Sequence, residues 1–208
     1  MTSPARHLFA YGSLLSPVSL LSTLPAVDID DVVPATLVGY RRVFNVAFPN
    51  DGSQPDKAYF DEAGGRPPFV LFSNLTSSPS ASVNGVLVPV SDTQLEALCE
   101  RERRYNLVAG SARTDTASSS RPILTFVGAD PFTATEDVRA GVVAASYLNL
   151  LVDGAHFWEQ RHPGFLDEFH ASTQIPTDTV VALRRVDIAG QHRGTALDSE
   201  TSEKQAPK

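Results

Sequence analysis

The first residues along the chain that could take part in binding or catalysis are Tyr11-Gly12-Ser13-Leu14. The apolar run Leu8–Tyr11 is typical of a short buried strand, and Gly12-Ser13 predicts a tight turn directly after it. A strand that ends in such a turn directs backbone N–H groups outward, where they can hold an anion or a developing oxyanion. The same pattern also fits a plain buried strand and turn, so these residues alone do not establish a site.

A second candidate is the carboxylate of Glu102. The segment after Ser91 predicts a helix over Asp92–Arg104, because Ser91 and Gln94 have the types and spacing of a capping box. With Leu95 placed at zero on a helical wheel, Glu102 falls near ~340°, inside the apolar stripe. Burial raises the pKa of a carboxyl group toward the range of a general acid or base. The helical phase therefore predicts an inward, catalytically capable carboxylate.

Two structural alternatives stay open for Glu102. Its carboxylate can form an internal ion pair with Arg41 or Arg42, or the helix can end before it, because inward carboxylates also arise in structural ion pairs. Four charged residues fall on the opposite arc of the wheel and are expected to face solvent: Glu96, Glu100, Arg103 and Arg104.

Other chemistry is less well supported. Ser13 as a nucleophile lacks a Gly-x-Ser-x-Gly elbow and an evident histidine partner, so serine hydrolysis is disfavoured. A group of residues near the C-terminal end invites a metal site, but their spacing lacks a recognised ligand motif and fits a polar helix face better. These residues are His156, Glu159, His162, Asp167 and His170. We therefore predict no metal.

Strands and helices must position the two candidates, and they follow one another without βαβ regularity, which favours an α+β fold. One or two strands are expected within Asp28–Asn45, which begins with an acidic loop. Further strands are expected over Phe69–Leu75, Val83–Val90, Tyr105–Ala109 and Ile123–Val127, and the first two of these are expected to pair across the Ser/Pro-rich segment Thr76–Ser82. Ser16–Leu24 is expected to be a short helix or a turn, and further helices are expected over Val142–Val152 and within Gly154–Ser172. Asn50–Pro68 is expected to be a long surface insertion.

In order along the chain, these motifs resemble the γ-glutamylcyclotransferase-like superfamily, which includes γ-glutamylcyclotransferases, γ-glutamylamine cyclotransferases and ChaC-type enzymes. The resemblance covers roughly residues 6 to 175. Its opening signature is similar to Tyr11-Gly12-Ser13-Leu14, and its middle signature to Asn84-Gly85 followed by Leu95, Leu98, Arg101-Glu102 and Tyr105. Further matches are Gly39-Tyr40-Arg41-Arg42-Val43-Phe44-Asn45 and the late Tyr147-Leu148 and Gly154. Leu98-Cys99-Glu100 departs from the Leu-Asp of many relatives, which leaves the subfamily and substrate open.

The resemblance implies a small mixed β-barrel flanked by short helices. It implies a cyclotransferase that converts a γ-glutamyl amide to 5-oxoproline and releases the amine, with no metal or organic cofactor. Carried over to this chain, Glu102 is the catalytic acid/base and Tyr11, Gly12, Ser13 and Leu14 form the substrate-binding turn. Periodicity places Tyr147 in the core, and the resemblance makes it a candidate pocket residue. The alternative is a non-catalytic member that binds a small acidic ligand, and the presence of Glu102 favours catalysis.

The composition of the chain limits the kinds of partner and location that we expect. The 208 residues carry a net charge of −7, which argues against binding to nucleic acid, and 42% of them are hydrophobic, which is ample for a core. The single Cys99 and the lack of a signal peptide or long apolar run predict a cytoplasmic protein without membrane association. We expect a small-molecule substrate, a monomer or weak homodimer, one domain over residues 1–190, and a polar, disordered tail over residues 191–208.

Overall fold

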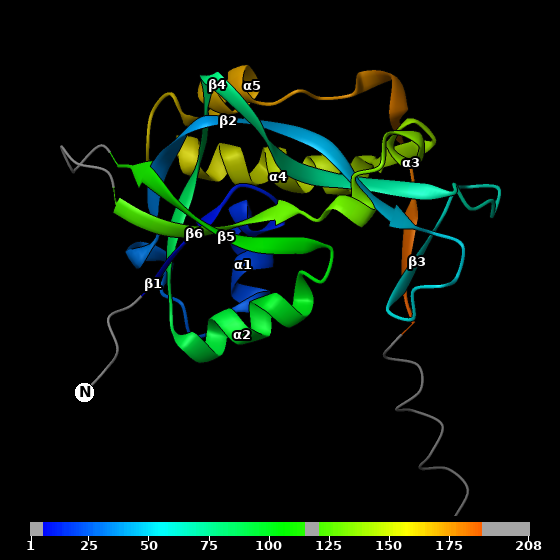
Figure 1. Cartoon of the computed structure of the whole chain (residues 1–208), viewed down its shortest axis with the longest axis horizontal. Coiled ribbons are helices and arrows are strands. Elements are labelled where there is room, and N and C mark those ends of the chain that lie inside the picture. The colour runs from blue at the N-terminus through cyan, green and yellow to red at the C-terminus, as the bar shows by residue number, and fades with distance from the viewer. Residues whose placement is uncertain (1–5, 115–120, 189–208) are drawn as a thin grey trace, which may run out of the picture.

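A closed β-barrel lies at the centre of the described residues, 6–114 and 121–188 (Figure 1). Its strands are β1 (Arg6–Ala10), β2 (Val33–Pro49), β4 (Phe69–Val90), β5 (Tyr105–Arg113) and β6 (Arg121–Gly128). They neighbour one another in the order β1, β6, β5, β2, β4, and β4 pairs again with β1. The β1–β6 pairing is parallel and the others are antiparallel. The predicted α+β class and mixed barrel are therefore confirmed.

The longest strand, β4, corrects one prediction. The sequence predicted two strands separated by Thr76–Ser82, whereas β4 is one strand of 22 residues. It pairs with β2 along most of its length, and the register shifts where Val38 opposes Ser82 and Tyr40 opposes Ser77. The Ser/Pro-rich residues are accommodated as a bulge in this shift, because β2 holds the strand on both sides of it.

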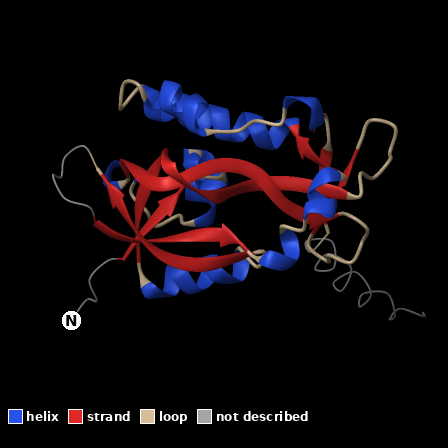
Figure 2. Ribbon diagram, turned by 45° about the horizontal axis from the view of Figure 1, so that its top comes forward, coloured by secondary structure: helices blue, strands red, loops and turns tan. Residues whose placement is uncertain are grey.

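Helices cover the barrel on two sides. Figure 2 shows α4 (Ala145–Glu159) and α5 (Phe165–Ser172) along one side and α2 (Asp92–Arg101) on the other. The remaining helices are α1 (Pro17–Thr23) and α3 (Thr135–Arg139), with single 3-10 turns η1 (Ser13–Leu15), η2 (Ile29–Asp31), η3 (Asp130–Phe132) and η4 (Thr177–Thr179). Short strands β7 (Gly141–Ala144) and β8 (Val180–Val181) extend the sheet beyond β4.

The helix predicted over Val142–Val152 is displaced toward the C-terminus. Its first residues belong to β7, which pairs in parallel with β4, and α4 begins at Ala145. The same helix then continues through Gly154, where a new helix had been expected. Gly154 packs on η1 so closely that a Cβ atom would lie 2.8 Å from the backbone nitrogen of Ser16. Long-range strand pairing therefore sets the start of this helix, and the missing side chain of Gly154 lets it pack closely on η1.

The predicted surface insertion Asn50–Pro68 contains a strand. β3 (Lys57–Phe60) pairs with β9 (Arg184–Asp187) in a separate two-stranded sheet, and its Tyr59 is buried. The Asn50 side chain organises this loop, since it donates to the carbonyl of Tyr59 and accepts from the same residue's N–H group. The sheet could not be predicted locally, because its partner strand lies more than a hundred residues away.

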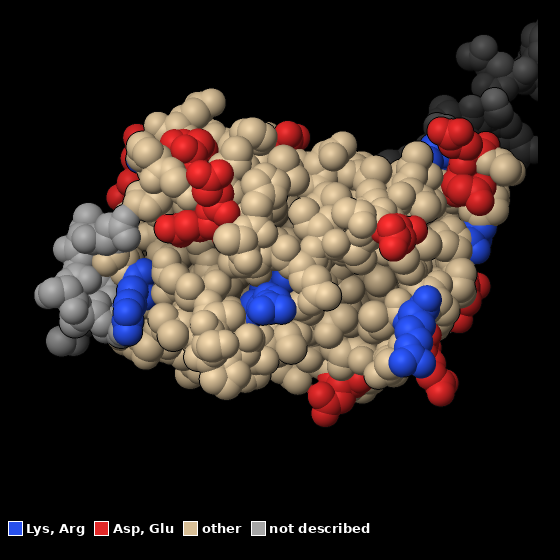
Figure 3. Space-filling model, turned by 90° about the horizontal axis from the view of Figure 1, so that it is seen from above, with Lys and Arg blue, Asp and Glu red and all other residues tan. Residues whose placement is uncertain are grey.

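Charged groups are unevenly distributed on the surface. Figure 3 shows a face on which Lys and Arg side chains are separated by uncharged residues, and Asp and Glu gather near its two ends. Within the described residues, no helix is long and apolar enough to cross a bilayer. The predicted tail, residues 191–208, lies outside the described residues, as does the predicted domain boundary at residue 190.

Candidate active site

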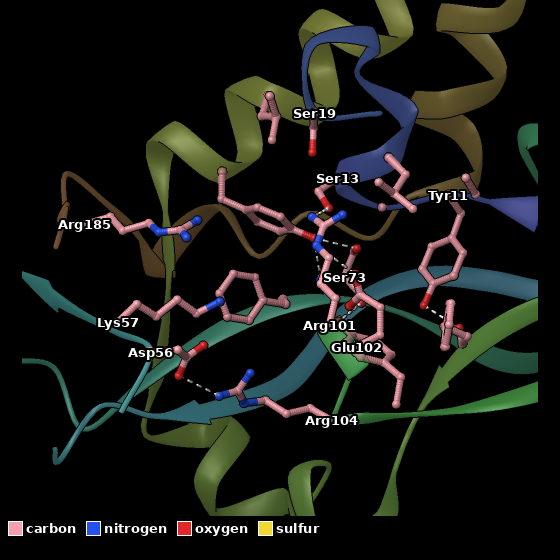
Figure 4. Close-up of a pocket in the computed structure, with 18 of the residues that line it drawn as sticks. Tyr11, Ser13, Ser19, Asp56, Lys57, Ser73, Arg101, Glu102, Arg104 and Arg185 are labelled. Carbon is pink, nitrogen blue, oxygen red and sulfur yellow. Dashed lines mark hydrogen bonds and ion pairs between the residues drawn. The ribbon is translucent and has the colours of Figure 1, made fainter. Parts of the chain in front are cut away.

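One cavity of about 370 Å³ brings the sequence-predicted site residues together (Figure 4). It lies beside the end of β1 and is bordered by the start of α4 and by the segment that follows α2. The predicted residues in its wall are Tyr11, Gly12, Ser13, Leu14, Glu102 and Tyr147. Residues separated by more than a hundred positions thus share one concave site, as binding and catalysis require.

The turn after β1 forms one wall of the cavity. The carbonyl of Gly12 accepts a hydrogen bond from the N–H of Leu15 at 2.9 Å, which closes η1. A Cβ atom at Gly12 would lie 2.7 Å from the Oγ of Ser73, so glycine is needed for close approach here. The Tyr11 hydroxyl donates to the carbonyl of Phe126 at 2.7 Å, so its proton is used in a hydrogen bond within the barrel.

Glu102 follows the last residue of α2. Its N–H donates to the carbonyl of Leu98 at 2.8 Å, and its side chain is 21% exposed. The helix thus ends before Glu102, as one alternative allowed, and the predicted extent to Arg104 is wrong. Glu102 nevertheless lies inward, because the C-terminal end of α2 borders the cavity.

Burial is the main influence on the Glu102 carboxyl group. It raises the pKa above the ordinary value, and the nearby cations Arg101, Lys57 and Arg104 oppose this rise in that order. The Arg101 Nε lies 3.4 Å from the Glu102 Oε1, whereas the predicted alternative partner Arg42 is engaged elsewhere. A raised pKa makes a carboxyl group better suited to accept a proton and return it than an ordinary surface carboxylate.

Arg101 links Glu102 to the turn. Its guanidinium donates to the Oγ of Ser13 at 3.3 Å and to the Oγ1 of Thr23 at 2.6 Å, while its Nε faces Glu102. Figure 4 shows the side chains of Ser13, Arg101 and Glu102 converging in the cavity. In the sequence, Arg101 was noted only as part of a motif. The structure shows that its side chain connects Glu102 with Ser13.

A hydroxyl cluster forms another part of the wall. Tyr147 and Ser73 share a hydrogen bond of 2.7 Å between their hydroxyl groups, and the Tyr147 oxygen also accepts from the Ser73 N–H at 3.2 Å. The Tyr105 hydroxyl donates to the Ser73 carbonyl at 2.8 Å. Burial raises the pKa of Tyr147 to about 12, so it remains protonated and available as a donor. Ser73 was not predicted from the sequence, since no motif marks it.

The opposite end of the cavity carries charged residues that the sequence did not assign to a site: Asp56, Lys57, Arg104 and Arg185. Arg104 was expected to face solvent but is buried, because the chain leaves the helical path after Arg101. Its guanidinium lies 4.4 Å from the ring centroid of Phe48 and its Nη2 lies 3.6 Å from the Asp56 carboxylate. The expected exposure of Glu96, Glu100 and Arg103 is confirmed.

The described residues give no support to the disfavoured chemistries. No histidine lines the described cavity wall beside Ser13. Over residues 6–114 and 121–188, no group of three or more His, Cys, Asp or Glu side chains could hold a metal ion. Glu159, from the weighed metal candidates, instead accepts hydrogen bonds from the N–H groups of Gly164 and Leu166 at the start of α5.

Comparisons with known proteins agree with this architecture. No protein-family model and no curated protein matches the chain in sequence. A solved structure described as a gamma-glutamyl cyclotransferase matches with a TM-score of 0.57 and 15% identity over 83% of this chain and 90% of that one. The uncharacterized human protein loc79017 matches with a TM-score of 0.57 and 16% identity over 84% and 91%.

A third structure, YkqA from Bacillus subtilis, matches with a TM-score of 0.54 and 16% identity over 81% of this chain and 54% of that protein. Identities this low carry information about architecture and not about activity, because one fold hosts many functions. The resemblance found in the sequence is therefore confirmed at the level of the fold, which the chain shares with a solved structure described as a gamma-glutamyl cyclotransferase.

Proposed function

We propose that the protein is a cyclotransferase that converts a γ-glutamyl amide to 5-oxoproline and releases the amine. One observation carries this proposal: the Tyr11–Leu14 turn and the inward carboxylate of Glu102 line the same cavity. The fold adds support, since a structure described as a gamma-glutamyl cyclotransferase shares it.

The proposed reaction needs no external nucleophile, because the substrate carries its own α-amine. Glu102 takes a proton from the α-ammonium group, and the freed amine attacks the γ-carbonyl carbon. The resulting tetrahedral intermediate bears an oxyanion. The bond from that carbon to the leaving nitrogen then breaks, and Glu102 returns the proton to this nitrogen. The ring nitrogen still carries one excess proton, and this proton passes to the released amine. A neutral five-membered lactam and an ammonium ion result, with every atom of the substrate retained.

Three features of the cavity suit this order of chemical steps. One carboxylate can serve as base and then as acid if its pKa lies near the working pH, and burial moves the pKa of Glu102 in that direction. The first N–H groups of a helical turn have no partner within that turn, so those of η1 can donate to the oxyanion or to the substrate carboxylate. Enclosure by Ser73 and Tyr147 holds the substrate folded for intramolecular attack.

The test is a product assay with the purified full chain. We expect 5-oxoproline and a stoichiometric amount of amine from at least one member of a panel of γ-glutamyl amino acids, peptides and amines. Release of glutamate instead of 5-oxoproline would indicate hydrolysis. Binding of a γ-glutamyl compound without turnover would favour the alternative of a non-catalytic protein that binds a small acidic ligand.

A further inference from the structure

The cavity has a cationic end that the proposed chemistry does not use. In Figure 4, Lys57 and Arg185 extend toward the side of the cavity that holds Ser73 and Glu102, and Arg104 lies below them. The sheet formed by β3 and β9 supplies Lys57 and Arg185, which come from opposite halves of the chain. This sheet therefore adds a charged wall to the site.

Cationic residues outnumber anionic ones in the lining of the cavity, although the whole chain has a net charge of −7. The cationic residues lining the cavity are Lys57, Arg101, Arg104 and Arg185, and the anionic ones are Asp56 and Glu102. An excess of positive charge in a cavity of an acidic protein favours an anionic ligand, because a recessed site concentrates the local field.

The arginines have carboxylate neighbours. Arg104 has Asp56, with 3.6 Å between Nη2 and Oδ1, and Arg185 donates from its Nε to Asp187 at 2.9 Å. Lys57 differs from them: no carboxylate of the described residues lies within ion-pair distance of its ammonium group. That group lies over two aromatic rings, 5.3 Å from the centroid of Phe48 and 5.0 Å from that of Phe72.

Lys57 is thus a partly buried cation that forms no ion pair with a carboxylate of the described residues, although Asp56 and Glu102 lie near enough to act on its charge. Burial, together with the like charges of Arg104 and Arg185, lowers the pKa of Lys57 to about 8. A bound anion would offset the cost of keeping this charge in the cavity, since a nearby opposite charge stabilises the ionised form.

We propose that this cationic end binds a carboxylate carried by the leaving amine, so that the substrates are γ-glutamyl amino acids or peptides rather than γ-glutamyl polyamines. The inference rests on the proposed function, in which the Tyr11–Leu14 turn holds the γ-glutamyl group at the other end of the cavity. A polyamine would bring a second cation toward Lys57 and Arg185, and like charges at close range oppose binding.

The first experiment measures binding without turnover, by calorimetry on Glu102→Gln. The probes are γ-glutamylalanine, its C-terminal amide, and the γ-glutamyl amide of 1,4-diaminobutane. γ-Glutamylalanine should bind at least about 10-fold more tightly than either other compound, because it alone carries a carboxylate on the leaving amine, where Lys57 can bind it. Equal affinities, or no binding of the acid, would overturn the inference.

Substitution of Lys57 tests the residue that carries the argument. Adding Lys57→Met to Glu102→Gln should weaken binding of the acid by about 10-fold or more and change binding of the amide by less than about 3-fold. Lys57→Arg keeps the charge and should retain the preference for the acid. An unchanged preference in folded Lys57→Met contradicts the proposal, and loss of the preference in Lys57→Arg does the same.

Strand β9 offers a matched pair of arginines. Arg185 lines the cavity, whereas its neighbour Arg184 does not and lies 5.5 Å from the ring centroid of Phe60. In the Glu102→Gln background, Arg185→Gln should weaken binding of the acid selectively, and Arg184→Gln should leave it unchanged. Equal effects of the two substitutions would indicate a general loss of surface charge and overturn the assignment of this wall.

Turnover by the wild-type chain separates this inference from the proposed function. Formation of 5-oxoproline with equal kcat/KM from acid, amide and polyamine derivatives would overturn the inference and leave the cyclotransferase standing. Selective binding of the acid that depends on Lys57, but without any 5-oxoproline, would support the carboxylate site and overturn the proposed reaction.

Discussion

At the scale of single residues, the position of Glu102 combines enclosure with a cationic neighbour. We expect Glu102→Gln to reduce kcat by about 10²- to 10⁴-fold, because the amide keeps the shape of the side chain but cannot shuttle a proton. The measurement is the rate of 5-oxoproline formation at saturating substrate, together with the affinity for the same compound. Affinity should change little, since the proposed binding turn stays intact.

The matched control is Glu100→Gln. Glu100 is exposed on α2, two residues before Glu102, and does not line the cavity. Its substitution should leave kcat within a few-fold of wild type. Equal losses in both variants, or full activity in both, would remove Glu102 from its assigned role.

A pH dependence follows from the lowered pKa of Lys57. The groups around it are Arg104, Arg185, Asp56 and Glu102, and its pKa of about 8 means that its charge is present below this pH and lost above it. Affinity for a substrate carboxylate should therefore fall as the pH rises through about 8. Calorimetric titrations between neutral and alkaline pH measure this, and in Lys57→Met the dependence should disappear.

The lowered pKa of Lys57 also makes the free energy of unfolding depend on pH, and this energy rises with pH where the affinity falls. In the unfolded chain Lys57 keeps its proton up to a pH of ~10.4, whereas in the folded chain the ammonium group loses its proton at a pH of about 8. Between these values the unfolded state binds more protons, so this residue makes the free energy of unfolding rise with pH. Urea unfolding of wild type and Lys57→Met across this window should differ in slope; parallel slopes would contradict the assigned pKa.

At the scale of elements, contact between α4 and the turn holds two walls of the cavity together. A Cβ atom at Gly154 would lie 2.8 to 2.9 Å from backbone atoms of Leu15 and Ser16, which cannot move aside independently. The indole of Trp158 adds a hydrogen bond of 2.9 Å to the carbonyl of Leu15. The start of α4, which carries Tyr147, is therefore positioned by contacts farther along the same helix.

We expect Gly154→Ala to lower the free energy of unfolding by at least about 1 kcal/mol, because overpacking outweighs the ~1 kcal/mol gain in helix propensity. Urea denaturation measures the change. His156→Ala, at an exposed position of the same helix, should stay within about 0.5 kcal/mol of wild type. Stabilisation by Gly154→Ala would mean that α4 does not contact the turn this closely.

At the scale of the whole molecule, Arg42 joins segments that are distant in sequence. It is fully buried; its Nε donates to the Tyr11 carbonyl at 2.9 Å, its Nη1 to the Thr173 Oγ1 at 2.6 Å, and its Nη2 to the Asn84 carbonyl. Its guanidinium also lies 4.5 Å from the ring centroid of Phe169. The end of β1, the barrel strand β4 and the segment after α5 thus depend on one side chain.

We expect Arg42→Met to lower the free energy of unfolding by about 3 kcal/mol or more, since it leaves several buried acceptors without a donor. Chemical denaturation compares it with Arg41→Met, an exposed neighbour on the same strand that should change stability little. Similar effects of the two substitutions would show that Arg42 is dispensable for joining these segments.

Local patterns were predictable because neighbouring residues establish them. The strand before Tyr11 and the turn at Gly12 follow from an apolar run broken by glycine. The start of α2 follows from its capping box, in which the Gln94 N–H donates to Ser91 Oγ and the Ser91 N–H donates to Gln94 Oε1. The inward direction of Glu102 was predicted from helical periodicity, although the helix ends one residue before it. The barrel was predicted only from the resemblance to the γ-glutamylcyclotransferase-like superfamily.

Tertiary structure decided what depends on partners remote in sequence. The end of α2 at Arg101 and the burial of Arg104 depend on what the chain meets after the helix, which amphipathic spacing does not encode. β4 continues through its Ser/Pro-rich segment because β2 holds it on both sides of the bulge. Lys57 and Arg185 share a cavity wall because β3 pairs with β9, and only long-range strand pairing can bring such distant charges together.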